Sequence, residues 1–397
     1  MKTLHFAITV ITAIMLFSCS KIGTGTSSSS YTTDGITTGA LSPGGSGSGS
    51  YNSDSATKAG VITAAEWNDL NNWSFWDSLV AIHDNQTVLT NWSFNTQNRV
   101  SVNVLNTALI PVNNVIVKLK RNGIVLSSAT TDNKGMVELW IDLFLPNSNP
   151  DTTGLQLDIN NGSQIINQVY TFKKGVNKVV LPGYGLPDNK IEVSFVVDAT
   201  GSMGDELEYL KNELNNVINT AKLDNPTSTI ATSCVFYRDE GDDYLTKVSD
   251  FTNDINTTIS FIKDQHADGG GDFPEAVHAA LDKSVNSLQW SANSKTRIIF
   301  LVLDAPPHNN ATVINSLQQT LLKANEKGIK IIPITASGIN KETEFIMRFF
   351  AMATNGTYVF ITNDSGIGNS HLQATVGPYT VEYLNNLMVR LINKYAQ

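Results

Sequence analysis

The sequence is poor in cysteine, poor in positive charge and without the short motifs of common hydrolases. Its 397 residues include two cysteines, Cys19 and Cys234, so at most one disulfide could form within the chain. The 27 Lys and Arg residues against 36 Asp and Glu residues give a formal net charge of −9. This acidic balance argues against nucleic acid as a partner, because binding to nucleic acid depends on basic patches.

Three motifs that mark catalytic or nucleotide-binding sites are missing from the chain. They are the Gly-x-Ser-x-Gly nucleophile turn, the Gly-x-x-x-x-Gly-Lys-Ser/Thr phosphate loop and the His-Glu-x-x-His zinc helix. Ser202, which lies in a strongly polar loop, has no evident base beside it in the sequence. We therefore predict that the protein is not an enzyme.

The first 60 residues predict a secreted chain that is held on a membrane by lipid. The apolar stretch at 6–17 is too short to span a bilayer but has the length of a signal-peptide core. It ends in Leu16-Phe17-Ser18-Cys19, which resembles a lipobox. Residues 1–18 are then a lipoprotein signal peptide and Cys19 carries the lipid; the alternative is an ordinary cleaved signal. Residues 19–60, mostly Gly, Ser and Thr, predict a flexible tether.

The next stretch of the chain divides into a Trp-rich segment and an all-β domain. Residues 61–93 contain four of the tryptophans, which we expect to pack against a neighbouring domain, and Thr63 is a suitable N-cap for a helix. Residues 94–183 contain short alternating strands, and Asn122-Gly123 predicts a tight hairpin turn. The sequence from Val115 to Gly135 resembles the carboxypeptidase regulatory-like domains, so we expect a β-sandwich spacer here.

After a boundary rich in Pro and Gly, residues 188–397 alternate between apolar strands and amphipathic helices. The strands are nearly continuous apolar runs, such as Ile298 to Leu303, which is typical of parallel strands covered on both faces. This pattern predicts an α/β domain with a doubly wound, mostly parallel sheet. The expected strands are 191–197, 229–237, 297–303, 329–335 and 357–362, and the expected helices are 203–221, 253–265, 274–287, 311–327, 341–353 and 379–395.

Three acidic loops follow strands or precede helices of this domain. Asp198, Thr200 and Ser202 come directly after the first strand, Asp272 follows a Gly-rich run, and Asp304 ends the central strand. Because ligands of doubly wound sheets bind at the carboxyl ends of the strands, we expect these side chains to meet there. Carboxylate and hydroxyl oxygens suit Mg²⁺, Mn²⁺ or Ca²⁺, so the sequence predicts a divalent-cation site.

The spacing Asp198-x-Thr200-x-Ser202, followed at a distance by Asp304, resembles the metal-ion-dependent adhesion site of von Willebrand factor A domains. The Gly-rich loop with Asp272 resembles the hemicentin-like branch of that family. The resemblance implies a metal held by these residues and an oxygen from the partner. An integrin-type site has Thr where we place Asp272, so a third carboxylate is expected to hold the ion more tightly, or to favour Ca²⁺, and to disfavour anionic partners. The alternative is that Asp272 hydrogen-bonds the Gly-rich loop and does not contact the metal.

The sequence thus predicts an adhesion or binding protein on a bacterial membrane, most simply the outer membrane, which faces the periplasm or the cell exterior. The expected partner is a protein or a glycan. Side chains placed on the rim of the site are Asp205, Glu206, Asp239, Glu275 and His308. Two alternatives stay open: a structural domain whose metal only stabilises the loops, and a metal-dependent hydrolase.

Overall fold

The computed structural model describes residues 58–145 and 151–397. The predicted signal peptide, Cys19 and the tether up to residue 57 lie outside the described residues. Among the described residues, none of the helices combines the length and the apolar character needed to cross a membrane.

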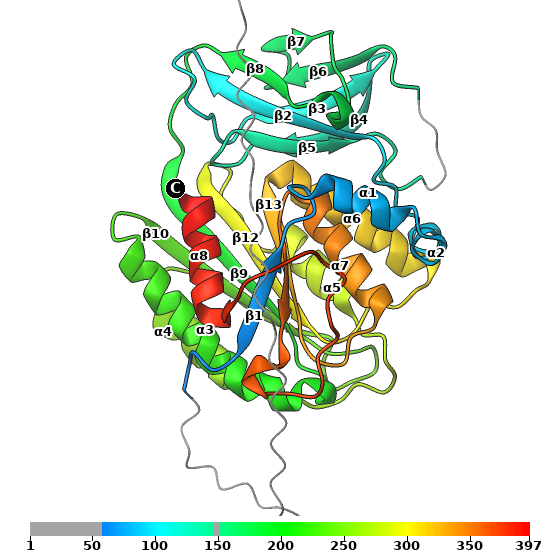
Figure 1. The fold of residues 1–397 in the computed structure, drawn as a ribbon. Coiled ribbons are helices and arrows are strands. Elements are labelled where there is room, and N and C mark those ends of the chain that lie inside the picture. Colours follow the sequence, from blue (N-terminus) through cyan, green and yellow to red (C-terminus); the bar gives the residue numbers. More distant parts are fainter. Residues whose placement is uncertain (1–57, 146–150) are drawn as a thin grey trace, which may run out of the picture. The chain divides into compact units, whose positions relative to one another are not determined.

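One large sheet forms the centre of the C-terminal half (Figure 1). Its strand order is β11-β10-β9-β12-β13-β14-β1-β15, and the five strands from β10 to β14 run parallel. The predicted doubly wound, mostly parallel α/β class is therefore confirmed. The strands are β9 (Asp188–Asp198), β10 (Thr229–Tyr237), β11 (Thr246–Thr252), β12 (Ser294–Leu303), β13 (Ile329–Thr335), β14 (Tyr358–Ile361), β15 (Val381–Tyr383) and β1 (Thr63–Trp67).

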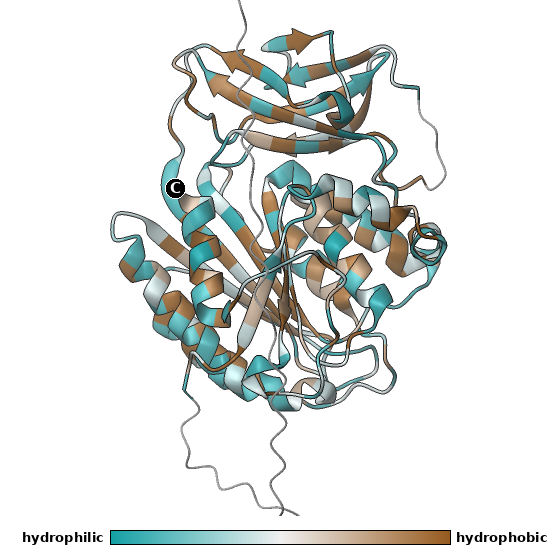
Figure 2. Ribbon diagram, in the orientation of Figure 1, coloured by the Kyte–Doolittle hydropathy of each residue, from teal (hydrophilic) through white to brown (hydrophobic). Residues whose placement is uncertain are grey.

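Helices cover both faces of this sheet, because its strands carry apolar side chains on both sides. In β9, Val193, Phe195 and Val197 enter one core and Val196 enters the other. Figure 2 shows the result as apolar strands between helices whose outer faces are hydrophilic. One face packs α3 (Gly204–Asp224), α4 (Ile255–Lys263) and α8 (Leu384–Ala396), and the other packs α5 (Val277–Asp282), the π-helical turn Lys283–Ser287, α6 (Ala311–Lys327) and α7 (Lys341–Ala353).

Strand β1 corrects the prediction that a helix begins at Thr63. Residues Thr63–Trp67 pair in antiparallel fashion with β14 on one side and with β15 on the other. The apparent capping pattern had no helix to cap, because Ala64 and Ala65 are buried in cores on opposite faces of the sheet, as strand residues are. The N-terminal segment therefore supplies a strand to a sheet whose other strands lie more than 100 residues further along the chain.

The packing role predicted for the Trp-rich segment is confirmed. After β1, α1 (Trp73–Val80) and α2 (His83–Asn91) lie against α7. The Trp76 ring stacks on Phe345 with 4.6 Å between ring centroids, and Trp92 Nε1 donates to Glu342 Oε1 at 2.7 Å. Trp76 and Trp92 therefore combine apolar contact on the α7 side of the core with a polar partner for the indole N–H, Thr96 for Trp76 and Glu342 for Trp92.

Residues 99–181 form two small sheets that share one apolar core, as the sandwich prediction requires. Asn122 and Gly123 have φ values of 50° and 82°, which confirms the tight hairpin turn between two of the strands. One sheet contains β5 (Met136–Trp140), β2 (Arg99–Asn106) and β8 (Asn177–Leu181), and the other contains β4 (Ile124–Thr130), β3 (Ile116–Arg121), β6 (Leu155–Ile159) and β7 (Gln164–Ile166).

Candidate metal centre

The first loop of the site is fixed by hydrogen bonds around Asp198, the last residue of β9. The backbone N–H and the hydroxyl of Thr200 both donate to Asp198 Oδ1, at 2.9 and 2.7 Å. The Thr200 and Ser202 hydroxyl oxygens lie 3.3 Å apart. Asp198 and Thr200 are fully buried, whereas Ser202 is exposed. The sequence Asp-x-Thr-x-Ser thus turns three oxygen-bearing side chains toward one region at the carboxyl end of β9.

Asp304 reaches the same edge of the sheet from the neighbouring strand. It follows β12, which runs parallel to β9 and is hydrogen-bonded to it. Only 4% of Asp304 is exposed, and burial together with the charge of Asp198 raises its pKa to about 7, while the Ser202 hydroxyl acts in the opposite direction. Burial likewise raises the pKa of Asp198 to about 6, against the effect of the two Thr200 hydrogen bonds. These two carboxylates repel each other in a poorly solvated place.

Glycines allow the second loop to pass close to the first. Gly270 has φ +74°, and a Cβ atom there would lie 2.9 Å from Glu275 Oε1 and 3.2 Å from Thr200 Cβ. The loops are also joined by backbone hydrogen bonds, from Gly201 N to Gly269 O at 3.1 Å and from Asp268 N to Ala199 O at 3.1 Å. Any larger residue at 270 would push the two loops apart.

The second loop carries two acidic side chains, of which Glu275 is buried and Asp272 is exposed. Glu275 is 3% exposed, and its pKa is raised to about 9 by burial and then by the charges of Asp198, Asp239 and Asp304. Asp272 is exposed, and within the described residues its side chain makes no hydrogen bond. Asp272 is thus an exposed loop carboxylate, whereas Glu275 is a buried acidic group whose pKa is raised by the charges of Asp198 and Asp304.

Sequence reasoning placed Glu275 on the rim and gave its side chain a general role at a helix start. The backbone explains its actual position. Glu275 N donates to Pro306 O at 2.9 Å, and Glu275 forms a parallel bridge with Pro307, so the second loop is bonded to the loop that follows Asp304. The contact of Glu275 with Pro306 and Pro307 is non-local, and in the sequence only the Gly run before Glu275 indicated that two loops pack closely here.

Buried carboxylate oxygens without a hydrogen-bond partner indicate whether these residues fit a cation. Asp198 Oδ2, Asp304 Oδ1 and Glu275 Oε2 are buried and have no hydrogen-bond partner. Buried carboxylate oxygens without a partner are costly, and a divalent cation would satisfy them. In the described part of the chain no three His, Cys, Asp or Glu side chains are close enough to hold an ion by themselves. The donor set therefore fits a cation held by two carboxylates with hydroxyl and solvent oxygens, which suits Mg²⁺, Mn²⁺ or Ca²⁺.

Of the five side chains predicted for the rim, two reach the surface. Asp205 is exposed and His308 is half-buried, whereas Glu206, Asp239 and Glu275 are buried. His308 Nε2 lies 2.7 Å from Asp239 Oδ1, so this pair is held together at the edge of the site. Glu206 Oε1 instead accepts from the backbone N–H of Ser337 at 3.0 Å and from its hydroxyl, which joins the start of α3 to the loop after β13.

Arg238 is bonded to the backbone of the first loop, a role that the sequence analysis did not assign to it. It is 6% exposed, its Nε donates to Ala199 O at 3.1 Å, and its Nη2 donates to His266 O at 2.8 Å. Its guanidinium also lies over the Tyr244 ring, 4.6 Å from the centroid. A guanidinium that is bonded to backbone carbonyls positions the loop and contributes positive charge beside an acidic site.

The metal-free protein is expected to lose stability at this site as the pH rises from about 4 to above 7. In the unfolded chain an aspartate titrates near pH 4. Asp198 and Asp304 have raised pKa values of about 6 and about 7 in the folded chain, so the folded state binds more protons in this interval. Asp304→Asn should therefore raise the unfolding midpoint in EDTA at pH 8 and leave it nearly unchanged at pH 5.

Thermal unfolding of the wild type and Asp304→Asn in EDTA at the two pH values measures this effect. The exposed Asp250 supplies a matched control, because Asp250→Asn removes one carboxylate far less buried than Asp304. A midpoint change in Asp304→Asn that is the same at pH 5 and pH 8 would contradict the assignment of a raised pKa to Asp304.

Comparison with known families finds one match in this half of the chain. Residues 192–366 match the family model of the von Willebrand factor A domain. The curated relatives include an ariadne-like RING finger protein of Acanthamoeba polyphaga mimivirus, 35% identical over 206 residues, and alpha-protein kinase vwkA of Dictyostelium discoideum, 29% identical over 143 residues. These matches cover 50% and 36% of this chain but 20% and 22% of the relatives, so the chain spans about a fifth of their length.

Solved structures with a similar arrangement include BatB from Bacteroides thetaiotaomicron and an aerotolerance-related membrane protein from Bacteroides fragilis. Both are 14% identical to this chain, with TM-scores of 0.34 and 0.33. In each case the alignment covers 52% of this chain and 98% of the solved chain.

Proposed function

We propose that the von Willebrand factor A domain at residues 192–366 is a binding module that holds a divalent cation and engages a protein or glycan partner through it. The residues proposed to hold the cation are Asp198, Thr200, Ser202 and Asp304. The observation that carries the proposal is the pair of buried, unpartnered carboxylate oxygens, Asp198 Oδ2 and Asp304 Oδ1, beside two hydroxyl groups. When bound, the cation supplies a Lewis-acidic point to which an oxygen of a partner can attach.

The residues proposed to hold the cation differ in exposure, and this supports a role in binding a partner rather than a role in stabilising the loops alone. Asp198 and Thr200 are buried and would fix the ion, whereas Ser202 is exposed and lies on the open side of the loop. The exposed Asp205 and the half-buried His308 flank the site. A partner oxygen could therefore approach from the Ser202 side without any change in the buried part of the site.

We further propose that the chain is anchored outside a bacterial membrane through lipid on Cys19, followed by the Gly/Ser/Thr-rich tether. This proposal is supported by the sequence Leu16-Phe17-Ser18-Cys19 after the short apolar stretch. Metabolic labelling with an alkynyl fatty acid should label the wild-type chain, and Cys19→Ser should remove the label. Labelling that persists in Cys19→Ser would contradict the anchor.

Cation binding is tested by thermal unfolding at pH 7.5 in EDTA and then with Mg²⁺, Mn²⁺ or Ca²⁺. A cation that binds only the folded state stabilises it by about 2.7 kcal/mol at a concentration of 100 Kd, so the midpoint should rise by several degrees. The rise should disappear in Asp198→Asn and persist in the matched variant Asp250→Asn. No rise with any of the three cations in the wild type would refute the metal site.

The binding role is separated from a purely structural role by adding a partner. Wild-type chain and Asp198→Asn are applied to immobilised cell-envelope material in the presence of the stabilising cation or of EDTA. The proposal expects retention of the wild type only with the cation, and no retention of Asp198→Asn. Stabilisation by the cation with equal retention in EDTA would mean that the metal only supports the loops.

A further inference from the structure

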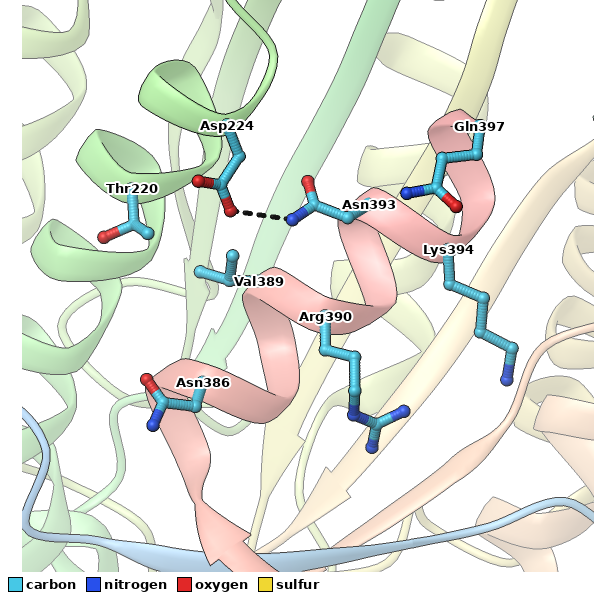
Figure 3. A pocket seen from close by; sticks show the side chains of 8 residues that line it. All are labelled: Thr220, Asp224, Asn386, Val389, Arg390, Asn393, Lys394 and Gln397. Carbon is cyan, nitrogen blue, oxygen red and sulfur yellow. Dashed lines mark hydrogen bonds between the residues drawn. The ribbon is translucent and has the colours of Figure 1, made fainter.

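Two cavities among the described residues have the volume of small-ligand sites, and they differ in how many of their polar side chains already have partners. The larger, about 470 Å³, lies between α3 and α8 (Figure 3). Several of its polar side chains already have partners: Asn393 donates to Asp224 Oδ2 at 2.8 Å, as the dashed line in Figure 3 shows, and Arg390 pairs with Glu66 and Glu382, outside the lining, at 2.8 and 2.6 Å. A ligand there would have to break contacts that the protein has already made.

The other cavity, about 410 Å³, lies in the small β domain. It opens between the turn that joins β6 to β7 and the chain that leaves β8. Strands β7 and β8 are terminal strands of the two small sheets, so the cavity lies at an open side of the sandwich. Its volume is within the range of about 300–1,000 Å³ that is usual for small-molecule sites. The lining residues are Asn160, Ser163, Gln164, Val180, Leu181, Pro182, Gly183 and Tyr184.

One wall of this cavity is a rigid turn. Asn161 and Gly162 have φ values of 54° and 95°, and Ser163 N donates to Asn160 O across the turn at 3.4 Å. Two successive left-handed residues in a short connection are typical of a tight hairpin turn that matches the twist of its strands. Asn160 itself has φ +49°, and Ser163 Oγ also donates to Asn160 O at 3.0 Å. These bonds fix the backbone of the wall that carries the Asn160 and Gln164 side chains.

The opposite wall provides an aromatic ring. Tyr184 is half-buried and packs against the apolar core of the sandwich, while Val180 is 42% exposed beside it. Gly183, with φ +68°, turns the chain between the end of β8 and this ring. The wall thus presents a fixed aromatic surface and an aliphatic side chain next to solvent.

The polar groups of the cavity are uncharged, and three of its polar side chains make no hydrogen bond within the described residues. None of its eight lining residues carries a charge, so an ionic ligand would lose hydration without a compensating partner. Within the described residues, the side-chain amides of Asn160 and Gln164 and the hydroxyl of Tyr184 make no hydrogen bond. Amides and hydroxyls both donate and accept, as the hydroxyl groups of a polyol do. An aromatic ring suits the C–H face of the same molecule.

We propose that this cavity binds a neutral saccharide of one or two sugar units. The Tyr184 ring packs on the apolar face of a sugar, and the amides of Asn160 and Gln164 bind its hydroxyl groups. The site is independent of the cation site, because none of its lining residues belongs to the loops around Asp198 and Asp304. Binding should therefore be the same in EDTA and in the presence of a divalent cation.

The experiment uses the full chain in EDTA and isothermal titration with cellobiose, maltose, lactose and N,N′-diacetylchitobiose, with glucuronic acid as the charged comparison. At least one neutral disaccharide should bind saturably, and glucuronic acid should not. Tyr184→Ala should weaken binding by about ten-fold or more, which corresponds to about 1.4 kcal/mol, and Gln164→Ala should weaken it less. Tyr170→Ala, which removes an exposed tyrosine of the same domain that does not line the cavity, should leave it unchanged.

Gln164→Ala keeps the test valid if Tyr184→Ala fails to fold, because the Gln164 amide makes no contact that the fold needs. Thermal unfolding of each variant checks that the sandwich is intact. The absence of binding for all four neutral disaccharides would overturn the proposal. Binding that is equally strong in Tyr184→Ala and Gln164→Ala would also overturn it, since the sugar would then occupy another surface.

Discussion

A full chain from which residues 61–70 are deleted is expected to lose its cooperative unfolding transition at room temperature or to accumulate as an insoluble protein. The deletion removes β1, which pairs with both β14 and β15, and leaves β14 as an open edge. It also removes Ile62 and Trp67, whose side chains are buried and contribute about 1.5–3 kcal/mol each. The loss is comparable with the whole stability of a typical domain, about 5–15 kcal/mol.

The deletion also leaves two buried charged side chains without their partners, so it should lower stability by more than the loss of apolar contact alone. Asp69 Oδ1 and Oδ2 accept from Arg348 Nη2 and Nε at 2.6 and 2.9 Å, and Arg348 is fully buried. Removing one partner of such a pair costs about 3–5 kcal/mol, because the other charge stays buried without compensation. Glu213, also fully buried, would lose the backbone N–H groups of Val61 and Ile62 that its carboxylate accepts.

The measurement compares the deleted chain with a full chain that lacks ten residues of the Gly/Ser/Thr-rich stretch, residues 41–50. The control deletion should leave the unfolding midpoint unchanged, whereas the deletion of 61–70 should abolish the transition. A peptide of residues 58–70 added in excess should restore it in part, and the same peptide with Asp69→Asn should restore it less. A deleted chain with the wild-type midpoint would show that β1 is not part of the folded domain.

Glu275→Gln is expected to weaken cation binding by about ten-fold or more without destabilising the metal-free protein. The raised pKa of Glu275, about 9, means that the carboxyl is protonated at neutral pH before a cation is present, so glutamine resembles it in shape and charge. A cation favours the ionised carboxylate, and because Glu275 is buried and interacts with the charges of Asp198 and Asp304, its negative charge would contribute to binding at their site. Glutamine cannot ionise, so the variant loses this contribution only when the cation binds.

Asp272→Asn is the matched comparison, because it removes the exposed carboxylate that the sequence placed at the site. Titration calorimetry with Ca²⁺ and with Mg²⁺ should show a change of less than about two-fold for Asp272→Asn. Unfolding midpoints in EDTA should be close to the wild-type value for both variants. If Asp272→Asn weakened cation binding more than Glu275→Gln did, Asp272 would be the residue that supplies the third carboxylate, as the sequence alone predicted.

The local parts of this fold were predictable because their signals are local. The apolar run from Ile298 to Leu303 and the helical spacing of 311–327 and 341–353 place β12, α6 and α7 correctly, the two helices to the residue. Asp198, Thr200 and Ser202 lie on one turn, so their meeting follows from a spacing of two residues. Asp304 follows the neighbouring parallel strand, and parallel strands present their carboxyl ends at one edge.

The parts that escaped prediction depend on contacts between distant residues. Strand β1 is short, and its residue Ala64 pairs with Ile361, almost 300 positions away. The edge strand β11 has only two apolar residues, Val248 and Phe251, and their spacing of three does not follow the alternation of a strand. Glu275 enters the site because its backbone bonds to Pro306, and nothing within a few residues of Glu275 reports this contact.

The position of β1 also determines how the folded part responds to a pull on its N-terminal end. The chain enters at Gly60, where the Glu213 carboxylate accepts from the backbone N–H groups of Gly60, Val61 and Ile62 at 2.9–3.2 Å. It then runs between β14 and β15, antiparallel to both. A force along β1 loads the hydrogen bonds of both ladders at once instead of opening them one at a time. Strand β1 is therefore expected to resist extraction in shear, and tension on the preceding chain would be carried by the central sheet.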